Sequence, residues 1–436
     1  MSPELAQTSS LSPEQLLALA AQAGAEAAEV YQTESLTQPV VFETNRLKQI
    51  ETSQAEGTAL RLWHQGRPGL AVAYGAVEPQ LLVEKALTLS QLNSPETPEL
   101  TAGDSQQFAA VGETIAVKQL IAYGESAIAQ IRDAYPEAIC AAELACEQEQ
   151  TRIVNSLGLD YRFQDITLSG YVDAEWIRGD DFLNVGDGQV DRHQLKPDAI
   201  AADIIQRLAW AKQSVAPPQG QVPVVFTAKA ADLLWDTLCA ALNGKRIAEG
   251  ASPWSERLGQ TVIAEPLSLR QDPTAGPYSC PFDDEGTLIQ PVELVSQGVM
   301  RGVYCDLKIG RQLGLASTGN GFRPGLGGYP QPSLLNLIVE PESLSWEQMI
   351  GSLDDAIVID QVLGNSGGLS GELSVNLELG YRVRQGHIVG RVKDTMIAGN
   401  VYTALKHLIG LGSDSVWNGS TYTPSVAVNG LSVTGS

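Results

Sequence analysis

Histidine is scarce in this sequence, and the few present are far apart. There are four of them: His64, His193, His387 and His407. A common zinc peptidase motif places two histidines on one face of a helix, with a catalytic glutamate between them, and that arrangement is absent. We therefore expect each histidine to be a surface or packing residue and predict no zinc site of this kind.

Positive charge is also scarce. The 436 residues include 28 Lys and Arg against 51 Asp and Glu, which gives a formal net charge of −23. Such a surface repels the phosphates of nucleic acids unless a local basic stripe is present. The densest basic stretch, 382–393, spreads its charges singly along an expected hairpin. The composition therefore excludes nucleic acid as an expected partner.

Paired cysteines and long apolar runs are missing as well. The five cysteines are widely spread and form no C-x-x-C pair, which is typical of reduced thiols in a cytoplasmic protein. No apolar run approaches the roughly 18 residues that a membrane-spanning helix needs. Residues 1–10 have neither the basic nor the apolar part of a secretory signal. We expect a cytoplasmic protein without a membrane partner.

The length indicates more than one domain. Two polar, proline-containing stretches, 93–108 and 215–221, are the expected linkers. We therefore predict three domains, which cover residues 1–105, 106–218 and 219–436.

Hydrophobic periodicity predicts mixed α and β structure. Ser12 and Pro13 form a helix start before apolar residues at helical spacing. Short strands are expected between the helices. Further helices are expected near 401–408 and over 80–92, 115–131, 198–212 and 228–243. The predicted fold class is α+β, with an N-terminal α/β domain and a larger β-rich C-terminal domain.

Two glycine-rich loops could carry chemistry. Residues 364–368, GNSGG, fit the G-x-S-x-G pattern of a serine nucleophile. That motif requires a helix after it, whereas 372–379 alternates like a strand, so a glycine-rich connection between strands is the favoured interpretation of Ser366. The loop at 319–328 lacks the GK[ST] ending of a phosphate loop, which favours a structural or peptide-contacting role.

The densest group of acidic side chains is Asp283, Asp284 and Glu285. Consecutive carboxylates could bind a hard cation or act in acid–base catalysis. Hydrogen-bonded or solvated turn carboxylates are an equally good interpretation, because no second cluster is close in sequence. An enzyme that uses this cluster or Ser366 is kept as a minor hypothesis.

Several segments, in a fixed order along the chain, resemble the TldD/PmbA family of TldD–TldE peptidases, once described as gyrase modulators. The matching segments are VVFETNRLK (40–48), EGTALR (56–61), GRPG (66–69), VNSLG (154–158), FDDEG (282–286), STGNGFR (317–323) and MIAGN (396–400). Any one of them is a weak signal, but the ordered series is specific. The resemblance implies an α+β fold and a cytoplasmic heterodimer in which peptides or unfolded chains are cut.

Members of this family are of two types. TldD-type chains carry H-E-x-x-x-H on a helix and a later cysteine ligand, whereas PmbA/TldE-type chains lack them. Aligned with that motif, this sequence has Trp235 at the first histidine, Asp236 at the glutamate and Ala240 at the second histidine. Residues 366–371, near the position of the later ligand, include no cysteine. Tryptophan and alanine do not ligate zinc. The resemblance therefore implies a PmbA/TldE-type subunit without a cofactor of its own, and a TldD-type partner that holds the zinc.

We therefore expect the chain to complete the substrate chamber of a zinc metalloprotease and to hold peptide backbone along exposed strand edges. The alternative is a homodimeric, non-enzymatic peptide-binding or chaperone-like protein. No catalytic residue is assigned. The candidate substrate or structural residues are Asp283, Asp284, Glu285, Asn320, Arg323, Asn365 and Asn400.

Overall fold

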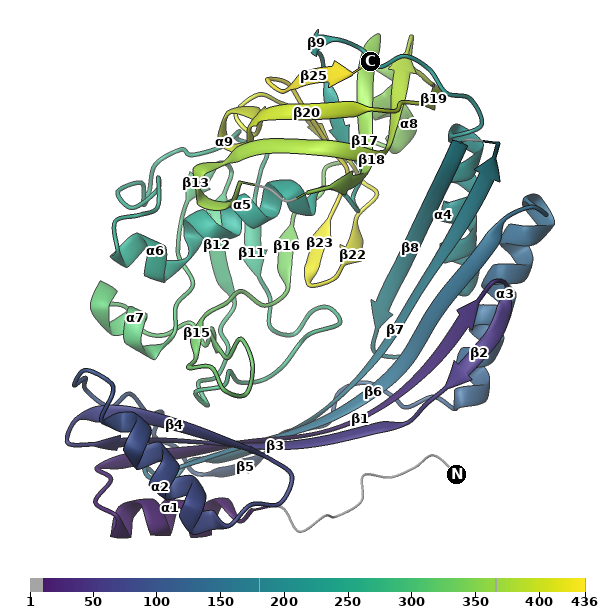
Figure 1. Ribbon diagram of the computed structural model, residues 1–436. Coiled ribbons are helices and arrows are strands. Elements are labelled where there is room, and N and C mark those ends of the chain that lie inside the picture. Colours follow the sequence, from purple (N-terminus) through teal and green to yellow (C-terminus); the bar gives the residue numbers. More distant parts are fainter. Residues whose placement is uncertain (1–10, 180, 365–366, 436) are drawn as a thin grey trace.

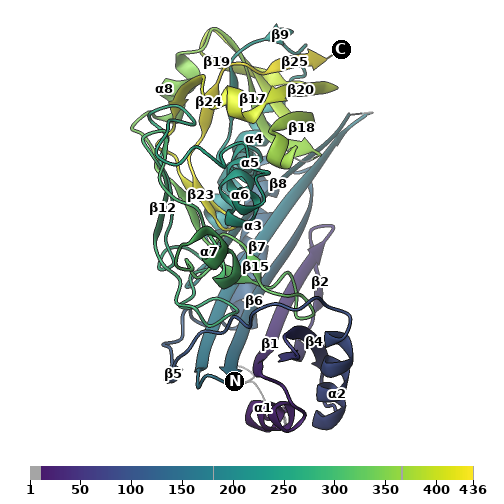
Figure 2. The same cartoon turned by 90° about the vertical axis from the view of Figure 1, so that its left-hand side faces the viewer.

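The computed structural model describes residues 11–179, 181–364 and 367–435. The chain forms an N-terminal unit built on one long curved sheet and a C-terminal unit that lies inside the curve (Figure 1). Turned by 90°, the C-terminal unit still lies along one face of the sheet (Figure 2). The predicted α+β class is confirmed.

The curved sheet has eight strands in the order β4-β3-β1-β6-β7-β5, with β2 paired to β1 and β8 paired to β7. Its long central strands alternate buried and accessible residues, because helices cover one face only. The strands are β1 (Ala27–Glu43), β2 (Arg46–Ile50), β3 (Ser53–His64), β4 (Arg67–Tyr74), β5 (Ser105–Gln107), β6 (Ile139–Asn155), β7 (Asp160–Arg178) and β8 (Asp181–Asp191).

Two pairs of helices cover the outer, convex face of this sheet (Figure 1). The first helix starts where expected, since the Ser12 hydroxyl accepts a hydrogen bond from the Gln15 backbone and Pro13 occupies the first turn. In the second pair, Gly124 lets a helix approach the Phe42 ring, which an added Cβ would meet at 2.3 Å. The helices are α1 (Pro13–Gln22), α2 (Pro79–Ser90), α3 (Val117–Ala134) and α4 (Pro197–Trp210).

The C-terminal unit combines a nine-stranded sheet, a six-stranded sheet and a two-stranded ribbon. Helix α5 (Asp232–Leu242) packs between its sheets, in a core that includes Trp235 and Leu238. The nine-stranded sheet contains β9 (Gly220–Gln221), β10 (Val224–Phe226), β17 (Asp355–Leu363), β18 (Glu372–Arg384), β19 (His387–Arg391), β20 (Thr395–Asn400), β21 (Leu408–Leu411), β24 (Val426–Val428) and β25 (Ser432–Gly435).

The other C-terminal elements are short. The six-stranded sheet contains β11 (Leu269–Gln271), β12 (Val292–Ser296), β13 (Val299–Met300), β16 (Leu337–Val339), β22 (Val416–Asn418) and β23 (Thr421–Thr423), and the ribbon contains β14 (Gly321–Phe322) and β15 (Gln331–Pro332). The helical elements are α6 (Gly244–Ala248), α7 (Leu307–Leu313), α8 (Trp346–Gly351), η1 (Gly368–Ser370) and α9 (Val401–Ala404).

The expected linker at 93–108 is an ordered part of the fold. It contributes β5, which pairs with β7, and its Glu96 and Glu99 form ion pairs with Lys308 and Arg311 of the C-terminal unit. Strands on both sides of residue 105 share one sheet, since β1 and β6 pair side by side. The three-domain division stays a prediction. In the described part of the chain, no helix combines the length and apolarity needed to cross a membrane.

Candidate functional site

A cleft of about 810 Å³ separates the curved sheet from the C-terminal unit. We call it the central cleft. Strands β6, β7 and β8 supply one wall, and helix α5, β17, β18 and the end of β22 supply the other. Its lining includes Glu143, Tyr171, Asp187, Arg207, Lys229, Asp232, Leu233, Asp236, Asp360, Val362, Glu378, Trp417 and Asn418.

Helix α5 carries the three positions that align with the zinc motif of TldD-type chains: Trp235, Asp236 and Ala240. Trp235 is buried in the C-terminal core, and its indole Nε1 donates a hydrogen bond to the Thr423 hydroxyl at 2.7 Å. Asp236 lies on the opposite, exposed side and lines the central cleft, while Ala240 is half-buried. An indole N–H is a donor, and alanine offers no ligand atom. These three residues therefore do not fit a zinc ion.

The cations of the central cleft are tied to buried carboxylates. Lys229 Nζ lies 2.5 Å from Asp187 and donates to the Gly188 carbonyl at 2.8 Å. Arg207 Nε lies 3.4 Å from Asp360. Both carboxylates are more than nine-tenths buried. The two cations neutralise this inner pair of acids and leave the outer acids of the cleft without such partners.

Two of the outer acids, Asp232 and Asp236, lie on the cleft face of α5. Burial raises the pKa of Asp232 to about 7, and the nearby Asp236 carboxylate adds to the rise. The Asn418 amide donates to Asp232 at 2.6 Å. Burial also raises the pKa of Asp236. Burial is thus the main cause of both shifts, and repulsion between the two acids, which lie one helical turn apart, adds to that of Asp232.

The outer edge of β8 is occupied by side chains of the chain itself. Gly186 donates its N–H to Gln361 Oε1 at 3.2 Å and accepts from Arg207 Nη1 at 2.9 Å. The Gly188 carbonyl accepts from Lys229, and the Phe182 carbonyl accepts from Arg391 at 3.3 Å. A peptide strand could pair here only by displacing these groups. Peptide binding along exposed edges stays a prediction, and the edge of β8 is not free for it.

The acidic cluster at 283–285 is buried and faces backbone donors. Asp283 is fully buried, and its two carboxylate oxygens accept three hydrogen bonds from the N–H groups of Glu285, Thr287 and Gly321, at 3.0, 2.9 and 2.7 Å. Burial raises the pKa of Asp283, and these donors oppose that rise. The side chain shapes this turn and ties it to β14.

The two following acids extend the same network. Asp284 accepts from the Arg323 N–H at 2.7 Å, and Glu285 accepts from the Leu307 N–H at 2.9 Å, at the start of α7. Burial raises the pKa of Glu285 to about 7, opposed by Arg61. Both carboxylates are thus engaged with backbone of the C-terminal unit.

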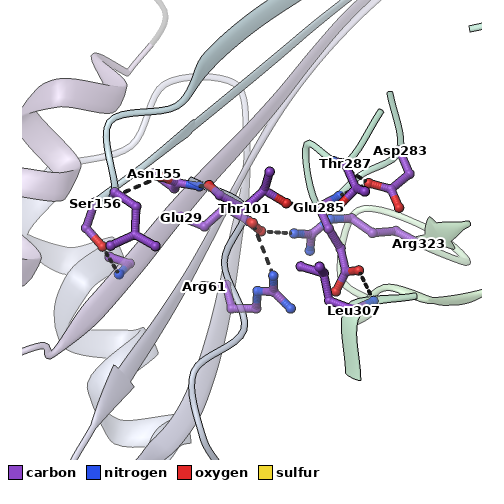
Figure 3. A network of polar contacts seen from close by, with 12 residues as sticks. Glu29, Arg61, Thr101, Asn155, Ser156, Asp283, Glu285, Thr287, Leu307 and Arg323 are labelled. Carbon is purple, nitrogen blue, oxygen red and sulfur yellow. Dashed lines mark hydrogen bonds and ion pairs between the residues drawn. The ribbon is translucent and has the colours of Figure 1, made fainter. Parts of the chain in front are cut away.

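Arg323 connects this cluster to the curved sheet. Its Nη2 donates to Glu29 Oε1 at 2.7 Å, and Arg61 Nη2 donates to the other Glu29 oxygen at 3.1 Å. Figure 3 shows the Glu29 carboxylate between the two guanidinium groups. All three side chains are at most 6% exposed. The arrangement is a buried clasp between the two units.

The remaining predicted site residues are not gathered in one place. Asn320 is fully buried, and its amide donates to Gln271 and to the Ser333 carbonyl, each at 2.7 Å. Asn400 caps α9 by accepting from Thr403 at 3.3 Å. Asn365 and Ser366, the residue in the G-x-S-x-G pattern, lie outside the described residues.

The histidines are on separate elements. His64 ends β3, His387 begins β19, His193 and His407 lie in turns, and His193 is 3.6 Å from Glu113. Among the residues that the structure describes, no three His, Cys, Asp or Glu side chains are grouped to hold a metal ion.

Sequence reasoning missed most of the central cleft. Its ion-paired residues Asp187, Arg207, Lys229 and Asp360 come from four distant segments, which no local spacing connects. One signal was present: acidic residues recur at every second or fourth position over 143–149, as expected for the accessible face of a strand.

Comparison with known proteins gives a consistent result. Residues 219–435 match the family model of the PmbA/TldA metallopeptidase C-terminal domain. Metalloprotease PmbA of Escherichia coli O157:H7 is 23% identical over 425 residues, which cover 88% of each chain. A metalloprotease of Methanothermobacter thermautotrophicus is 28% identical over 206 residues, 45% of this chain and 44% of that protein. The chain thus spans less than half the length of that archaeal relative.

The fold is shared with a solved structure. TldE from Thermococcus kodakarensis superposes with a TM-score of 0.86 at 22% identity, and the match covers 97% of this chain and 99% of that one. The arrangement of the two units therefore recurs at low sequence identity.

Proposed function

Because the chain belongs to the PmbA/TldD family, we propose that it is a PmbA/TldE-type subunit of a cytoplasmic TldD–TldE metallopeptidase. In this role it supplies a wall of the chamber in which peptides or unfolded chains are cut, and its TldD-type partner supplies the zinc. Substrate would reach the partner's metal past the central cleft, which lies beside α5.

One observation carries this proposal: the position on α5 that aligns with the first histidine of the family's metal motif is packed into the protein core. Trp235 fills the position of the first ligand, inside the core and hydrogen-bonded to Thr423. Replacing a ligand by a large apolar side chain removes metal chemistry at that position while preserving the fold. A chain of this kind would contribute shape and charge to catalysis, and no bond-breaking group of its own is required.

The test is peptide hydrolysis by the purified chain, by a TldD-type protein and by their mixture, each with added zinc and then with a chelator. We expect the mixture to be more active than the TldD-type protein alone, the isolated chain to be inactive, and the chelator to abolish activity. Co-elution of the two proteins in size-exclusion chromatography should accompany the gain.

Other results would contradict the proposal in distinct ways. Failure to form a complex, together with peptide binding by a dimer of this chain, would favour the homodimeric peptide-binding alternative. Activity of the isolated chain that survives the chelator would indicate a metal-independent nucleophile, and Ser366→Ala would then be the first variant to make.

A further inference from the structure

Both walls of the central cleft are acidic. On the wall formed by the curved sheet, Glu143 projects from the concave face of β6, and Asp187 lies on β8. On the opposite wall Asp232 and Asp236 project from α5, Asp360 from β17 and Glu378 from β18. These six carboxylates share the cleft with two cations, Arg207 and Lys229. If all groups are ionised, the lining has an excess of four negative charges.

The excess is not neutralised within the chain. The carboxylates of Glu143, Asp236 and Glu378 have no hydrogen-bond or ion-pair partner among the residues that the structure describes. Facing carboxylates across a cleft repel each other, and low-dielectric walls strengthen the field between them. That field attracts a cation and repels an anion.

A buried acid adds to the same field. Asp360 is 3% exposed and lines the cleft. Its Oδ1 accepts from the Thr227 hydroxyl at 3.2 Å, and its Oδ2 lies 3.4 Å from Arg207 Nε. Because Arg207 also lies 3.9 Å from Asp187, one guanidinium group is shared between two buried carboxylates.

The remaining lining fits an organic cation with an alkyl stem. Leu233, Val362, Trp417 and Tyr171 provide apolar and aromatic surface between the acids. Lysine and arginine bury their alkyl stems against such surface and place their charge against carboxylates or ring faces. A bare metal ion is a poorer fit, because the acids do not converge on one point. The occupied edge of β8 disfavours recognition through a paired peptide backbone.

We propose that the central cleft binds the ammonium or guanidinium side chain of a peptide, so that this subunit selects basic segments of the substrate. The inference rests on the proposed function in one respect: the peptide is the substrate of the same chamber. The cleft recognises the charge and the alkyl stem of the basic side chain. The backbone of the bound segment does not pair with the edge of β8.

The test uses three labelled pentapeptides, acetylated and amidated, with lysine, glutamine or glutamate at the centre of four alanines. Their affinity for the full chain is measured by fluorescence anisotropy at low and high salt. A fourth peptide, with glutamine at the centre and a free amino terminus, separates an amino-terminal cation from a side-chain cation. We expect the lysine peptide to bind at least about tenfold more tightly than the glutamine peptide, and less tightly at high salt.

Asp236→Asn and Glu378→Gln remove one unpaired charge each from the cleft. Each should weaken the lysine peptide about threefold, and the double variant about tenfold, without changing the glutamine peptide. Glu265→Gln is the matched control, because Glu265 is exposed and lies outside the cleft. Thermal unfolding of each variant checks that the fold is intact.

Equal binding of the lysine and glutamine peptides, unchanged affinity in the double variant, or no binding by either the chain or its complex would each overturn this inference. Preference for the free amino terminus over the lysine side chain would also overturn it. Co-elution with a TldD-type protein is scored separately. The subunit role and the charge preference can therefore fail independently.

Discussion

Glu29, in the first strand of the curved sheet, accepts a hydrogen bond from Arg323 of the C-terminal unit at 2.7 Å, across 294 residues of sequence. Arg61 donates to the other oxygen of the same carboxylate. One buried anion thus holds two buried cations, and the two units meet at this point. The stability of the clasp depends on Glu29 more than on either arginine.

We therefore expect Glu29→Gln to destabilise the protein by about 3–4 kcal/mol, because it removes the carboxylate that two buried guanidinium groups share. Urea unfolding monitored by tryptophan fluorescence measures this change. The control is Glu43→Gln, which removes an exposed partner of Lys48 and should change stability by about 0.5 kcal/mol or less. A loss below about 1 kcal/mol for Glu29→Gln would show that the clasp is not a stabilising contact.

Trp235 offers a second test, on the helix that aligns with the metal motif. Trp235→Phe keeps an aromatic ring but removes the hydrogen bond to Thr423, whose hydroxyl is fully buried. We expect a loss of about 1–3 kcal/mol from the missing bond and the smaller ring. A double-mutant cycle with Thr423→Val isolates the bond. If the double variant loses as much stability as the two single variants together, the hydrogen bond between the indole N–H and Thr423 contributes nothing to stability.

The carboxylate of Asp283 provides a third prediction, which separates a structural from a substrate-binding role. In Asp283→Asn, one oxygen becomes an NH₂ group that faces a backbone N–H, so at least one of the three hydrogen bonds is lost. We expect a loss of about 2–3 kcal/mol and unchanged peptide affinity in the folded protein. Full stability combined with lost peptide binding would instead assign Asp283 to the substrate.

The sequence predicted local structure better than long-range contacts. Helices α1 to α4 and the hairpin at 382–393 follow from capping residues and periodicity, which act within a few residues. The strands were expected to be short, whereas β1 continues through Pro39 because its pairing with β6 does. Pairing between distant segments leaves no local signal, so the shared sheet was not predicted.

The same limit applies to the site. The acids at 283–285 were noticed because they are consecutive, yet their role depends on Gly321, Leu307 and Arg61, which are distant in sequence. Asp236 was singled out only through its alignment with a motif. Glu143 and Glu378, which line the same cleft, lie on strands that come near Asp236 only in the folded chain.

The last prediction concerns pH. In the folded chain the pKa of Asp232 is about 7, whereas an unfolded aspartate has a pKa near about 3.9. Between these values the folded state holds a proton that the unfolded state has lost, so the free energy of unfolding falls as pH rises from about 4 to 7. Asp232→Asn removes this dependence, and above pH 7 the variant should be more stable than the wild type. Because Asp232 is partly exposed and lies in the first turn of α5, where the helix dipole favours its charged form, we expect a gain of about 1 kcal/mol.

Urea unfolding at pH 4 and at pH 8 measures the difference between wild type and variant at each end of this window. The control is Glu347→Gln, in the first turn of α8, where hydrogen bonds from its own backbone and from Ser345 lower the pKa. A carboxylate with a lowered pKa stabilises the fold at pH values above its unfolded pKa, and this stability is lost as pH falls. Glu347→Gln should therefore be less stable than the wild type at pH 8, which is the opposite of the result expected for Asp232→Asn. If Asp232→Asn is less stable than the wild type at pH 8, the carboxylate is a stabilising anion there and its ionisation carries no cost. In that case the acidity of the α5 face arises from charges held at every pH above 4, and the preference of the central cleft for cations should not weaken between pH 8 and pH 6.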